Sequence, residues 1–555
     1  MMSKDNLTAK QSDYAVFLPA ISGFYATFIG KQRNEQYVDP ARFPAGLTDL
    51  EQMNWLNDQA ALFPYRWSLY SGGHANLDLT KQDWSEDMVR NRDPNTLVLG
   101  DSGGFQIAKG LWEGDWRDPS SPSVQKLLKQ LAARGIEERT NAKGKVVKVD
   151  LVKEHQAKLD AAQKKREQVL AWLDGISNYC MTLDIPTWVV HDKKAGAACC
   201  ITTHSEAVDA TKYNNEYFMK HRKGVKNGGT RILNVLQGAN HTEAEDWYQT
   251  MKHYCDPTVY PDTHFDGWAM GGQNMCDVHL ILKRLVALRY DNLLQPGKHD
   301  WMHFLGTSKL EWAVLLTTIQ RAVRKYVNEN FTISFDCASP FLATANGQVY
   351  FENVFPDGGK WSYRMAPSAD DKKYSTDTRK WSTGVVADGI YKNWEESPIS
   401  DLLTMKDICI YKPGDLNKIG KEGKTSWDSF SYALLMGHNV YQHITAVQEA
   451  NRRFDAGEAP AMMRSSSPTK DRFEDIVEAI FSAQDRATAE AIIEHYGGPE
   501  GYWTEIIGTR GFSGAKAFNS HGNFNAMFSF AEDEVQEDSE EFDESKLDQL
   551  EQGQK

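Results

Sequence analysis

Cysteine is scarce in this sequence. Its 555 residues include seven cysteines, thinly spread, and none forms a Cys-x-x-Cys pair. A disulfide framework is therefore excluded, and reduced thiols are expected. Histidines in His-Glu-x-x-His or His-x-His spacing are missing, and so is a glycine-rich dinucleotide-binding loop. These patterns predict neither a metal site nor a cofactor, although a carboxylate cluster around magnesium stays open.

Long apolar runs are also missing. The first twenty residues lack the basic segment and apolar stretch of a secretion signal, and no later run is apolar enough to cross a bilayer. Hydrophobic residues make up 41% and charged residues 25% of the chain, as in ordinary globular proteins. We therefore expect a cytoplasmic protein of two or three domains without a membrane partner.

Positive charge is in deficit, with a formal net charge of -14. Much of this charge lies in the segment 531–555, where eleven residues are acidic and two are basic. Such a run predicts a disordered, solvated tail. The rest of the chain carries a net charge of only -5, so a local basic groove for phosphate groups is compatible with the composition.

Short apolar runs alternate with helical patterns, which predicts an α/β protein with a parallel sheet covered on both faces. At least six such units between about 90 and 340 favour a (β/α)8 TIM barrel, assigned to residues 1–345. An open doubly wound sheet is the alternative. The runs are TLVLGDSGG (96–104), YCMTLDIPT (179–187), RILNVLQGA (231–239), FDGWAMGG (265–272), MHFLGTS (302–308) and FTISFDCAS (331–339).

Three further segments interrupt or follow the barrel. The Lys-rich segment 140–172 is predicted to be a helical insertion, either a solvated surface helix or an arm touching a phosphate backbone. The segment 346–425 is predicted to be an inserted irregular or β-rich module, and 426–530 a helical C-terminal region. The module's aromatic side chains form either its core or a surface for stacking bases. They are Trp361, Tyr363, Trp381 and Trp394.

The stretch LVLGDSGGFQ (97–106) offers two chemical interpretations. GDSGG is typical of the nucleophile loop of chymotrypsin-like proteases, with Ser102 as the nucleophile. Only His74 precedes Ser102, however, the preceding chain is too short for that double barrel, and no G-x-S-x-G signature is present. A serine hydrolase is thus the remote option. The second interpretation is a buried strand that delivers Asp101 to a cleft.

Taken alone, Asp101 is better explained as a turn residue or a helix N-cap. Asp184 in TLDIPT and Asp336 in FDCAS, however, occupy the corresponding position at the end of their own runs. Because the carboxyl ends of barrel strands gather at one face, the three carboxylates are expected to meet there. They indicate acid–base or nucleophilic chemistry or a metal, and Gln237 and nearby glycines favour hydrogen bonding to a planar ligand.

Five ordered blocks give the chain a specific resemblance. DSGGFQ (101–106), NVLQGA (234–239), GWAMGG (267–272), FLGTS (304–308) and FDCASP (335–340) resemble the signature blocks of the tRNA-guanine transglycosylase family. That family is a TIM barrel that exchanges guanine for a 7-deazaguanine base without a cofactor. The resemblance covers about residues 90–340.

The resemblance implies roles for individual residues. Asp336 would be the nucleophile that forms a covalent sugar intermediate, and Asp101 the general acid–base. The other matched positions would bind the base: a carboxylate reads its N1–H and 2-amino edge, a side-chain amide and backbone groups bind O6, and two apolar side chains grip its faces. The base-binding set is Asp184, Gln237, Gly267, Phe105, Leu305, Ser102 and Gly271.

The sequence also departs from the family. No zinc-binding cysteine cluster follows Asp336, and Gln273 and Asn274 stand where preQ1-using members carry a glutamate, which favours a neutral base such as preQ0. Together with the insertions, these departures resemble the DNA-acting branch, the DpdA-type 7-deazaguanine DNA transglycosylases of bacteria and phages. For a phage protein, the location would be the host cytoplasm.

Two alternatives to DNA base exchange stay open. One is a tRNA-guanine transglycosylase, and the other is a non-catalytic nucleic-acid-binding barrel subunit, against which the retained Asp101 and Asp336 argue. Family members often form homodimers, but the sequence leaves the oligomeric state of this chain open.

Overall fold

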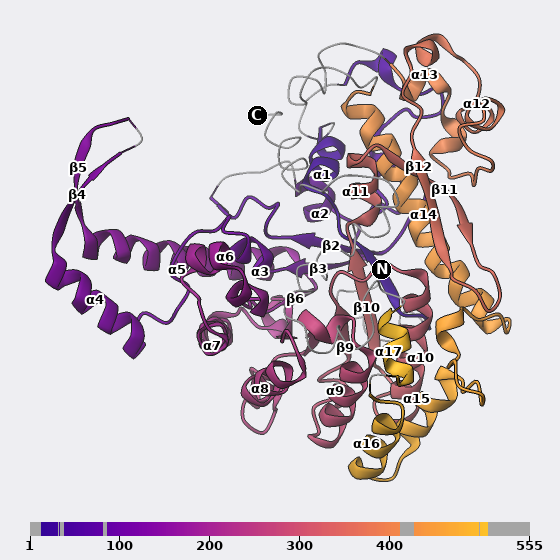
Figure 1. Cartoon of the computed structure of the whole chain (residues 1–555). Coiled ribbons are helices and arrows are strands. Elements are labelled where there is room, and N and C mark those ends of the chain that lie inside the picture. The colour runs from indigo at the N-terminus through magenta and orange to yellow at the C-terminus, as the bar shows by residue number, and fades with distance from the viewer. Residues whose placement is uncertain are drawn as a thin grey trace.

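Eight parallel strands form a barrel at the centre of the molecule (Figure 1). The computed structural model describes residues 13–31, 33, 38–80, 86–141, 143–410, 427–498 and 500–508. The strands follow the order β1-β10-β9-β8-β7-β6-β3-β2, and a bridge between Ala20 and Leu69 joins the two edges. The strands are β1 (Val16–Pro19), β2 (Trp67–Ser71), β3 (Leu97–Asp101), β6 (Tyr179–Met181), β7 (Arg231–Leu236), β8 (Gly267–Met270), β9 (Trp301–Phe304) and β10 (Thr332–Cys337).

The (β/α)8 prediction is confirmed, and the open doubly wound alternative is wrong because the sheet curves until its edges meet. Each of the six apolar runs contains a strand. The sequence analysis missed β1 and β2, which lie before residue 90 as the short runs VFLP and WSLYS. Without an adjacent strong helical pattern, runs this short carry little signal.

The barrel interior is filled by side chains rather than open. Alternate residues of each strand point inward, as the two-residue period of a strand requires. They form a compact apolar cluster that includes Val16, Leu18, Trp67, Leu69, Leu97, Leu99, Tyr179, Met181, Leu233, Val235, Ala269 and Trp301. Because these side chains fill the interior of the barrel, a functional site is expected at the ends of the strands.

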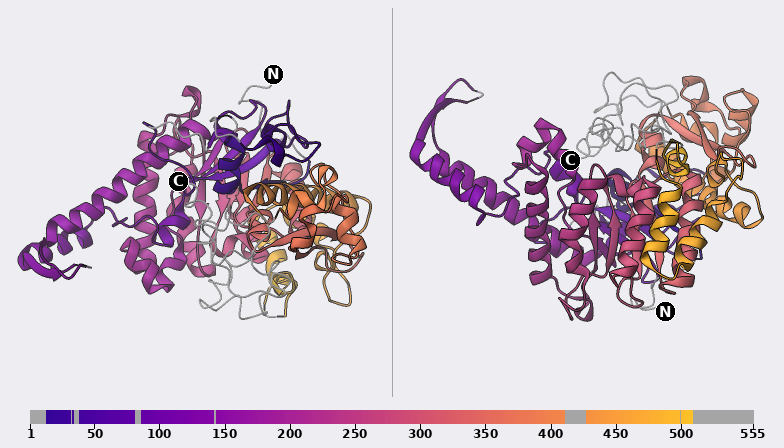
Figure 2. Two further views of the ribbon diagram at one scale, coloured as in Figure 1. Left: turned by 90° about the horizontal axis from the view of Figure 1, so that it is seen from above. Right: turned by 60° about the horizontal axis from the view of Figure 1, so that its bottom comes forward.

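Helices surround the barrel and cover the outer face of the sheet (Figures 1 and 2). The α9 helix, for example, begins after Asp277, whose side chain accepts the Leu280 N–H at the N-cap. The barrel helices are α1 (Gly23–Gly30), α2 (Asp87–Arg90), α3 (Gly104–Ala108), α6 (Lys193–Cys199), α7 (His204–His221), α8 (His241–Met251), α9 (Val278–Tyr290), α10 (Leu310–Tyr326) and α11 (Ser339–Ala345).

An insertion between β3 and β6 differs from its prediction. The segment 140–172 was expected to be helical, but only α5 (Leu151–Ile176) is, and the residues before it belong to an antiparallel hairpin. This hairpin pairs β4 (Ile136–Thr140) with β5 (Val146–Asp150) and follows α4 (Pro122–Arg134). The alternating pattern of VVKVD suits a strand, and Asp150 then caps α5. These elements form an arm that projects from the barrel (Figure 2).

The segment after the barrel packs against it. The hairpin of β11 (Gln348–Val354) and β12 (Ser362–Pro367) precedes α12 (Trp381–Ala387) and α13 (Met405–Ile408). Of the aromatic residues considered for base stacking, Trp361, Tyr363 and Trp381 are buried and Trp394 is half-buried, so they belong to the core. Residues 411–426 of this module lie outside the described residues.

The C-terminal region is helical as far as the structure describes it. It contains α14 (Ser429–Asp455), α15 (Phe473–Ser482), α16 (Arg486–His495) and α17 (Tyr502–Gly508). The predicted acidic tail, 531–555, lies outside the described residues. Among the described helices, none is both long and apolar enough to span a bilayer.

Candidate active site

Three carboxylates lie at the carboxyl ends of barrel strands. Asp101 is the last residue of β3, Asp184 follows β6, and Asp336 is the penultimate residue of β10. Burial raises the pKa of both Asp101 and Asp184; the charge of Asp336 adds to the first shift and the charge of Asp101 to the second. In a barrel of parallel strands the carboxyl ends of all the strands gather at one face, the mouth of the barrel. The structure thus brings the three predicted carboxylates to one mouth.

Asp336 is held through one of its two oxygens. Its Oδ1 atom lies 3.0 Å from His303 Nε2 and accepts a 3.0 Å hydrogen bond from the Gly306 N–H. His303 is fully buried, and its Nδ1 atom lies 2.8 Å from the Ser334 hydroxyl. Neither contact uses the second oxygen, Oδ2. The carboxylate is therefore oriented while Oδ2 stays available to a ligand.

His303 was missed by the sequence analysis. It lies within the quoted run MHFLGTS, but a single histidine inside an apolar strand gives no signal of chemistry. Its contact with Asp336 arises because β9 and β10 are neighbours. The two-residue period of a strand would place His303 and Leu305 on the same side of β9, which is the only clue in the sequence.

Asp101 sits in a less solvated position than an ordinary surface aspartate. Its Oδ2 accepts a 2.6 Å hydrogen bond from the Ser71 hydroxyl, and its Oδ1 accepts a 3.3 Å bond from the Gly103 N–H. Burial raises the pKa of Asp101 more than these bonds lower it. The protonated form is thus easier to reach than in water, which suits a group that gives and takes a proton.

Asp184 is paired with Gln237 at the mouth. The Gln237 Nε2 group donates a 2.7 Å hydrogen bond to Asp184 Oδ2, and both side chains are buried. Burial, together with the charge of Asp101, raises the pKa of Asp184 to about 7. The Oε1 atom of Gln237 is buried without a hydrogen-bond partner among the described residues. An unpartnered buried acceptor is costly, so it suits a site that a polar ligand completes.

Two glycines after β8 border this pair. A Cβ atom on Gly271 would lie 2.7 Å from Gln237 Nε2 and 3.3 Å from Leu305 Cδ1, and one on Gly272 would lie 2.9 Å from Gln237 Oε1. Gly272 also has a φ of 54°, which favours glycine. The absence of side chains here leaves room beside Gln237.

The placement of Gly267 in the base-binding set is wrong. Gly267 is the first residue of β8 and pairs with Leu233 and Trp301 inside the sheet. It therefore lies at the amino end of the strand, whereas Gly271 lies just past the carboxyl end. The backbone of Gly271 and Gly272 occupies the place that was assigned to Gly267.

The two apolar residues of the predicted sandwich, Phe105 and Leu305, are both partly buried. Leu305 follows β9 and contacts the Gly271 position. Phe105 lies in α3 next to Gly104, and a Cβ atom on Gly104 would lie 3.1 Å from Asp184 Oδ1. Leu305 thus borders the space beside Gln237, whereas the Phe105 ring packs near Trp188 with the Lys109 ammonium over it.

Ser102 is not presented as a nucleophile. It is 1% exposed, and its hydroxyl donates a 2.8 Å hydrogen bond to the Thr182 carbonyl. This bond joins the end of β3 to the segment after β6. Ser102 thus holds two segments of the mouth together. This role argues against both the hydrolase option and a direct contact with the base.

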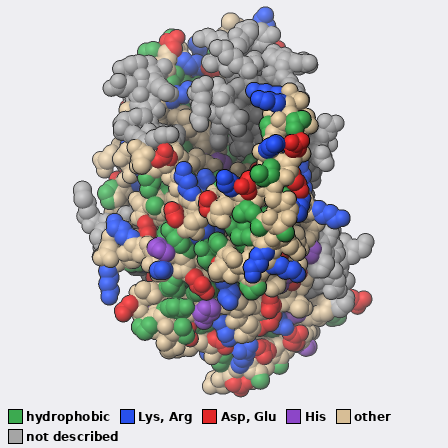
Figure 3. All heavy atoms as spheres, turned by 90° about the vertical axis from the view of Figure 1, so that its left-hand side faces the viewer, with side chains coloured by type: hydrophobic (Ala, Val, Ile, Leu, Met, Phe, Trp, Pro, Cys, Tyr) green, Lys and Arg blue, Asp and Glu red, His purple; other side chains and the backbone are tan. Residues whose placement is uncertain are grey.

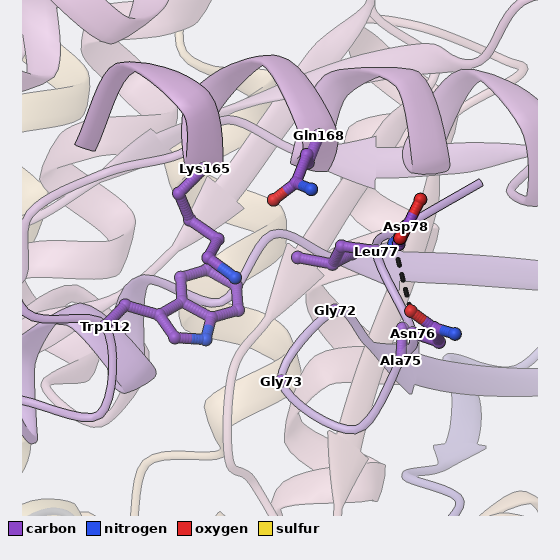
Figure 4. A pocket seen from close by; sticks show the side chains of 9 residues that line it. All are labelled: Gly72, Gly73, Ala75, Asn76, Leu77, Asp78, Trp112, Lys165 and Gln168. Carbon is purple, nitrogen blue, oxygen red and sulfur yellow. Dashed lines mark hydrogen bonds between the residues drawn. The ribbon is translucent and has the colours of Figure 1, made fainter. Parts of the chain in front are cut away.

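A cavity of about 260 Å³ lies beside the mouth (Figure 4). It is lined by the loop after β2, by Trp112 and by Lys165 and Gln168 of α5. The Gly72 N–H donates to the Asp101 carbonyl. On the other wall, a Cβ atom on Gly103 would lie 2.4 Å from the Trp112 ring, so that ring covers the DSGGFQ loop. The cavity therefore lies between the loop that follows β2, next to the DSGGFQ loop, and α5 of the arm.

No protein-family model matches the chain, and no curated protein matches it at a significant level. The case for a function therefore depends on the residues of the mouth.

Proposed function

We propose that this protein is a DNA base-exchange transglycosylase that replaces guanine in DNA with a 7-deazaguanine base such as preQ0. The observation that carries the proposal is the meeting of Asp101, Asp184 and Asp336 at one mouth, with Asp336 Oδ2 left available by its two contacts. The glycine-lined space beside Gln237 supports a planar ligand at the same place.

In the first step, Asp336 Oδ2 attacks C1′ of the deoxyribose. The C1′–N9 bond breaks through an oxocarbenium-like state as the C1′–O bond forms, and guanine leaves with the electron pair and takes a proton from Asp101. The raised pKa of Asp101 supports its presence in the protonated form for this step. The product is a covalent ester between the sugar and Asp336.

In the second step, the incoming base loses its ring N–H proton to the Asp101 carboxylate. The ring nitrogen attacks C1′, and the bond to Asp336 breaks, which restores both carboxyl groups and retains the configuration at C1′. Because C1′ is enclosed within a stacked duplex, the nucleotide must first be extruded into the mouth. The chemistry requires no nucleoside triphosphate and no cofactor.

Recognition of the base falls to Asp184 and Gln237. An ionised Asp184 accepts two hydrogen bonds, from N1–H and the 2-amino group. In the free protein Gln237 Nε2 donates to Asp184, so binding requires this amide to turn towards O6 of the base. Phe105 and Leu305 would contact the two faces of the ring.

The direct test is incubation of the protein with labelled guanine or preQ0 and either duplex DNA or bulk tRNA. We expect label in DNA, together with a covalent protein–DNA adduct that is absent in the isosteric variant Asp336→Asn. Label in tRNA alone would replace DNA with tRNA as the substrate. An adduct that persists in Asp336→Asn, or Ser102 labelled by an organophosphonate, would contradict the mechanism.

A further inference from the structure

The arm consists of α4, β4, β5 and α5. The second half of α5 is buried against the barrel, but α4 and the β4–β5 hairpin make few contacts with the rest of the molecule. The arm projects away from the barrel in every view (Figures 1 and 2). Its α4 helix packs on α5, and its two strands pair only with each other. The hairpin also exposes Ile136 and Val146, which are 64% and 58% accessible. An element built this way buries little apolar surface for its own stability, so its role is better sought in binding.

The arm is cationic although the chain is acidic. Residues 122–176 carry twelve Lys and Arg against seven Asp and Glu, while the whole chain has a net charge of -14. Between Glu138 and Asp150 there are four cations and no carboxylate. Lys and Arg side chains are also scattered over the face from which the arm projects (Figure 3).

Most of these cations are not neutralised within the protein. The arm's ion pairs engage mainly its arginines, as in Arg134–Glu137 and Arg139–Glu154. Several lysines are exposed and form no ion pair with any residue that the structure describes. They are Lys126, Lys129, Lys143, Lys145, Lys148, Lys158 and Lys164.

The arm starts at the mouth. Lys165 and Gln168 of α5 line the cavity beside Asp101, and the Lys165 ammonium lies 4.9 Å from the centre of the Trp112 ring. From Lys165 to Leu151, α5 extends about 21 Å at 1.5 Å per residue, and the hairpin adds up to about 17 Å at 3.3–3.4 Å per residue. The tip therefore lies within reach of roughly one turn, about 34 Å, of a duplex whose base enters the mouth.

We propose that the arm binds B-form duplex DNA, with the basic tip of the β4–β5 hairpin in the major groove about one turn from the extruded base. This inference rests on the proposed function, because that function makes the mouth the place where the base enters. The lysines of the tip neutralise phosphates, and the pocket of Trp112 and Lys165 receives the strand that enters the mouth.

The shape of the tip favours DNA over an RNA duplex. The major groove of B-form DNA admits a two-stranded β-ribbon. The major groove of A-form RNA is deep and narrow and excludes one. A two-stranded hairpin that carries its lysines around a glycine turn at Gly144 fits the first geometry.

The test compares two triple variants of the full chain. The first is Lys143→Gln, Lys145→Gln and Lys148→Gln, which removes three charges from the tip. The matched control is Lys223→Gln, Lys226→Gln and Lys298→Gln, three exposed lysines on loops that precede β7 and β9 at the opposite end of the barrel. Binding of a duplex of about 30 base pairs, three turns at about 10 per turn, is measured over a range of salt concentrations.

We expect the tip variant to bind at least tenfold more weakly at low salt. The slope of log affinity against log salt should shrink by up to about 2.7, since each phosphate that a lysine neutralises adds about 0.9 to it. The control variant should bind as the native chain does. Equal binding by both variants overturns the proposal, and so does a preference for an RNA duplex that depends on the same lysines.

This experiment distinguishes a failure of the proposed DNA binding by the arm from a failure of the proposed base exchange. If base exchange is absent but the tip variant still shows a smaller salt dependence of DNA affinity than the native chain, the proposed function is wrong and the arm's role is supported. If exchange proceeds equally in the native chain and the tip variant, with equal affinities, the arm's role fails and the proposed function stands. Asp336→Asn, used in parallel, should bind the duplex with the native salt slope.

Discussion

At the residue scale, the orientation of Asp336 depends on a fully buried histidine. His303 and the Gly306 N–H hold Oδ1, and the Ser334 hydroxyl at Nδ1 in turn fixes the imidazole. We regard His303 as a positioning residue. Its effect should therefore fall on the rate of attack rather than on the binding of the base.

His303→Ala should slow formation of the covalent adduct about 10- to 100-fold, because a hydrogen bond to a charged group contributes about 1.5–3 kcal/mol. The KM for the free base should change little. His303→Gln, whose amide can still donate, should retain more activity than His303→Ala. Rapid-quench measurement of adduct formation checks this, and an effect confined to KM would contradict it.

Asp184 makes a second prediction at this scale, since its pKa is raised to about 7. The ionised form accepts the two donors of guanine, so affinity for the free base should rise with pH through about 7 and fall about tenfold per pH unit well below it. Calorimetric titration between pH 5.5 and 8.5 measures this dependence. A flat profile in the native protein would contradict it.

The isosteric variant Asp184→Asn provides the control for that titration. It should bind guanine weakly and without the pH dependence, since it cannot ionise. The same variant should be more stable than the native chain at pH 8. The folded-state pKa lies above the ordinary value of 3.8, so the stability linked to Asp184 is complete below about pH 4 and is lost as the pH rises through 7.

At the scale of elements, the loop after β8 places glycine where a side chain would enter the site. Gly271→Ala puts a Cβ atom 2.7 Å from Gln237 Nε2, so the amide must shift away from Asp184. Weaker binding of the base, by about tenfold, is expected with the fold intact. Because the displaced group is the end of a flexible side chain, the loss of stability should be small.

Gly175→Ala is the matched control for this loop. Gly175 is exposed on α5, and its added Cβ would meet no atom within 4 Å. The substitution should leave base affinity unchanged and raise the free energy of unfolding by about 0.4–1 kcal/mol, since alanine restricts the unfolded chain. Equal affinities of the two alanine variants for the base would show that the loop after β8 does not belong to the base-binding site.

At the scale of the whole molecule, aromatic rings join the C-terminal region to the barrel. His443 of α14 stacks between Phe17 of β1 and Tyr363 of β12, with ring centres 4.3 and 4.4 Å away. The Tyr363 hydroxyl lies 2.9 Å from His443 Nε2 and also donates to the Ser308 carbonyl. The segment after the barrel is thus part of the structure that supports the strand ends.

Buried histidines, including His443 at this contact, predict that the stability of the protein falls at acidic pH. Burial lowers the pKa of His443 to about 3 and those of His438 and His299 to about 4, against 6.5 for a free histidine. Below pH 6.5 these histidines bind protons in the unfolded chain but stay neutral in the folded chain. The free energy of unfolding should therefore fall by up to about 1.4 kcal/mol per pH unit for each histidine as the pH drops from 6.5 towards 4.

Urea unfolding at pH 7, 5.5 and 4.5 measures that slope. His443→Phe keeps a ring between Phe17 and Tyr363 but cannot be protonated, so it should flatten the slope by one histidine's share. Buried carboxyl groups with a raised pKa, such as Asp101 and Asp184, act in the opposite direction over part of this range, and comparing the variant with the native chain at each pH cancels their contribution. An identical slope in the variant would show that His443 does not contribute.

How far the sequence predicted the site depended on whether the signal was local. A buried strand that ends in a carboxylate is visible within ten residues, so Asp101, Asp184 and Asp336 could be identified from their own runs. Gly267 and Gly271 lie in the same block, and only the boundaries of β8 show which of them is at the mouth. The strand β5 within 140–172 was not predicted because its lysine fits an exposed strand as well as a helix.

The sequence by itself determined the alternation of strands and helices and the carboxylates at the strand ends, because apolar periodicity and strand termini are encoded by neighbouring residues. Tertiary structure alone decided the closure of β1 against β2, the partnership of His303 with Asp336 and the projection of the arm. Each of these depends on which distant segments pack together. That choice is made by the burial of apolar surface over the whole chain and leaves no mark at a single position.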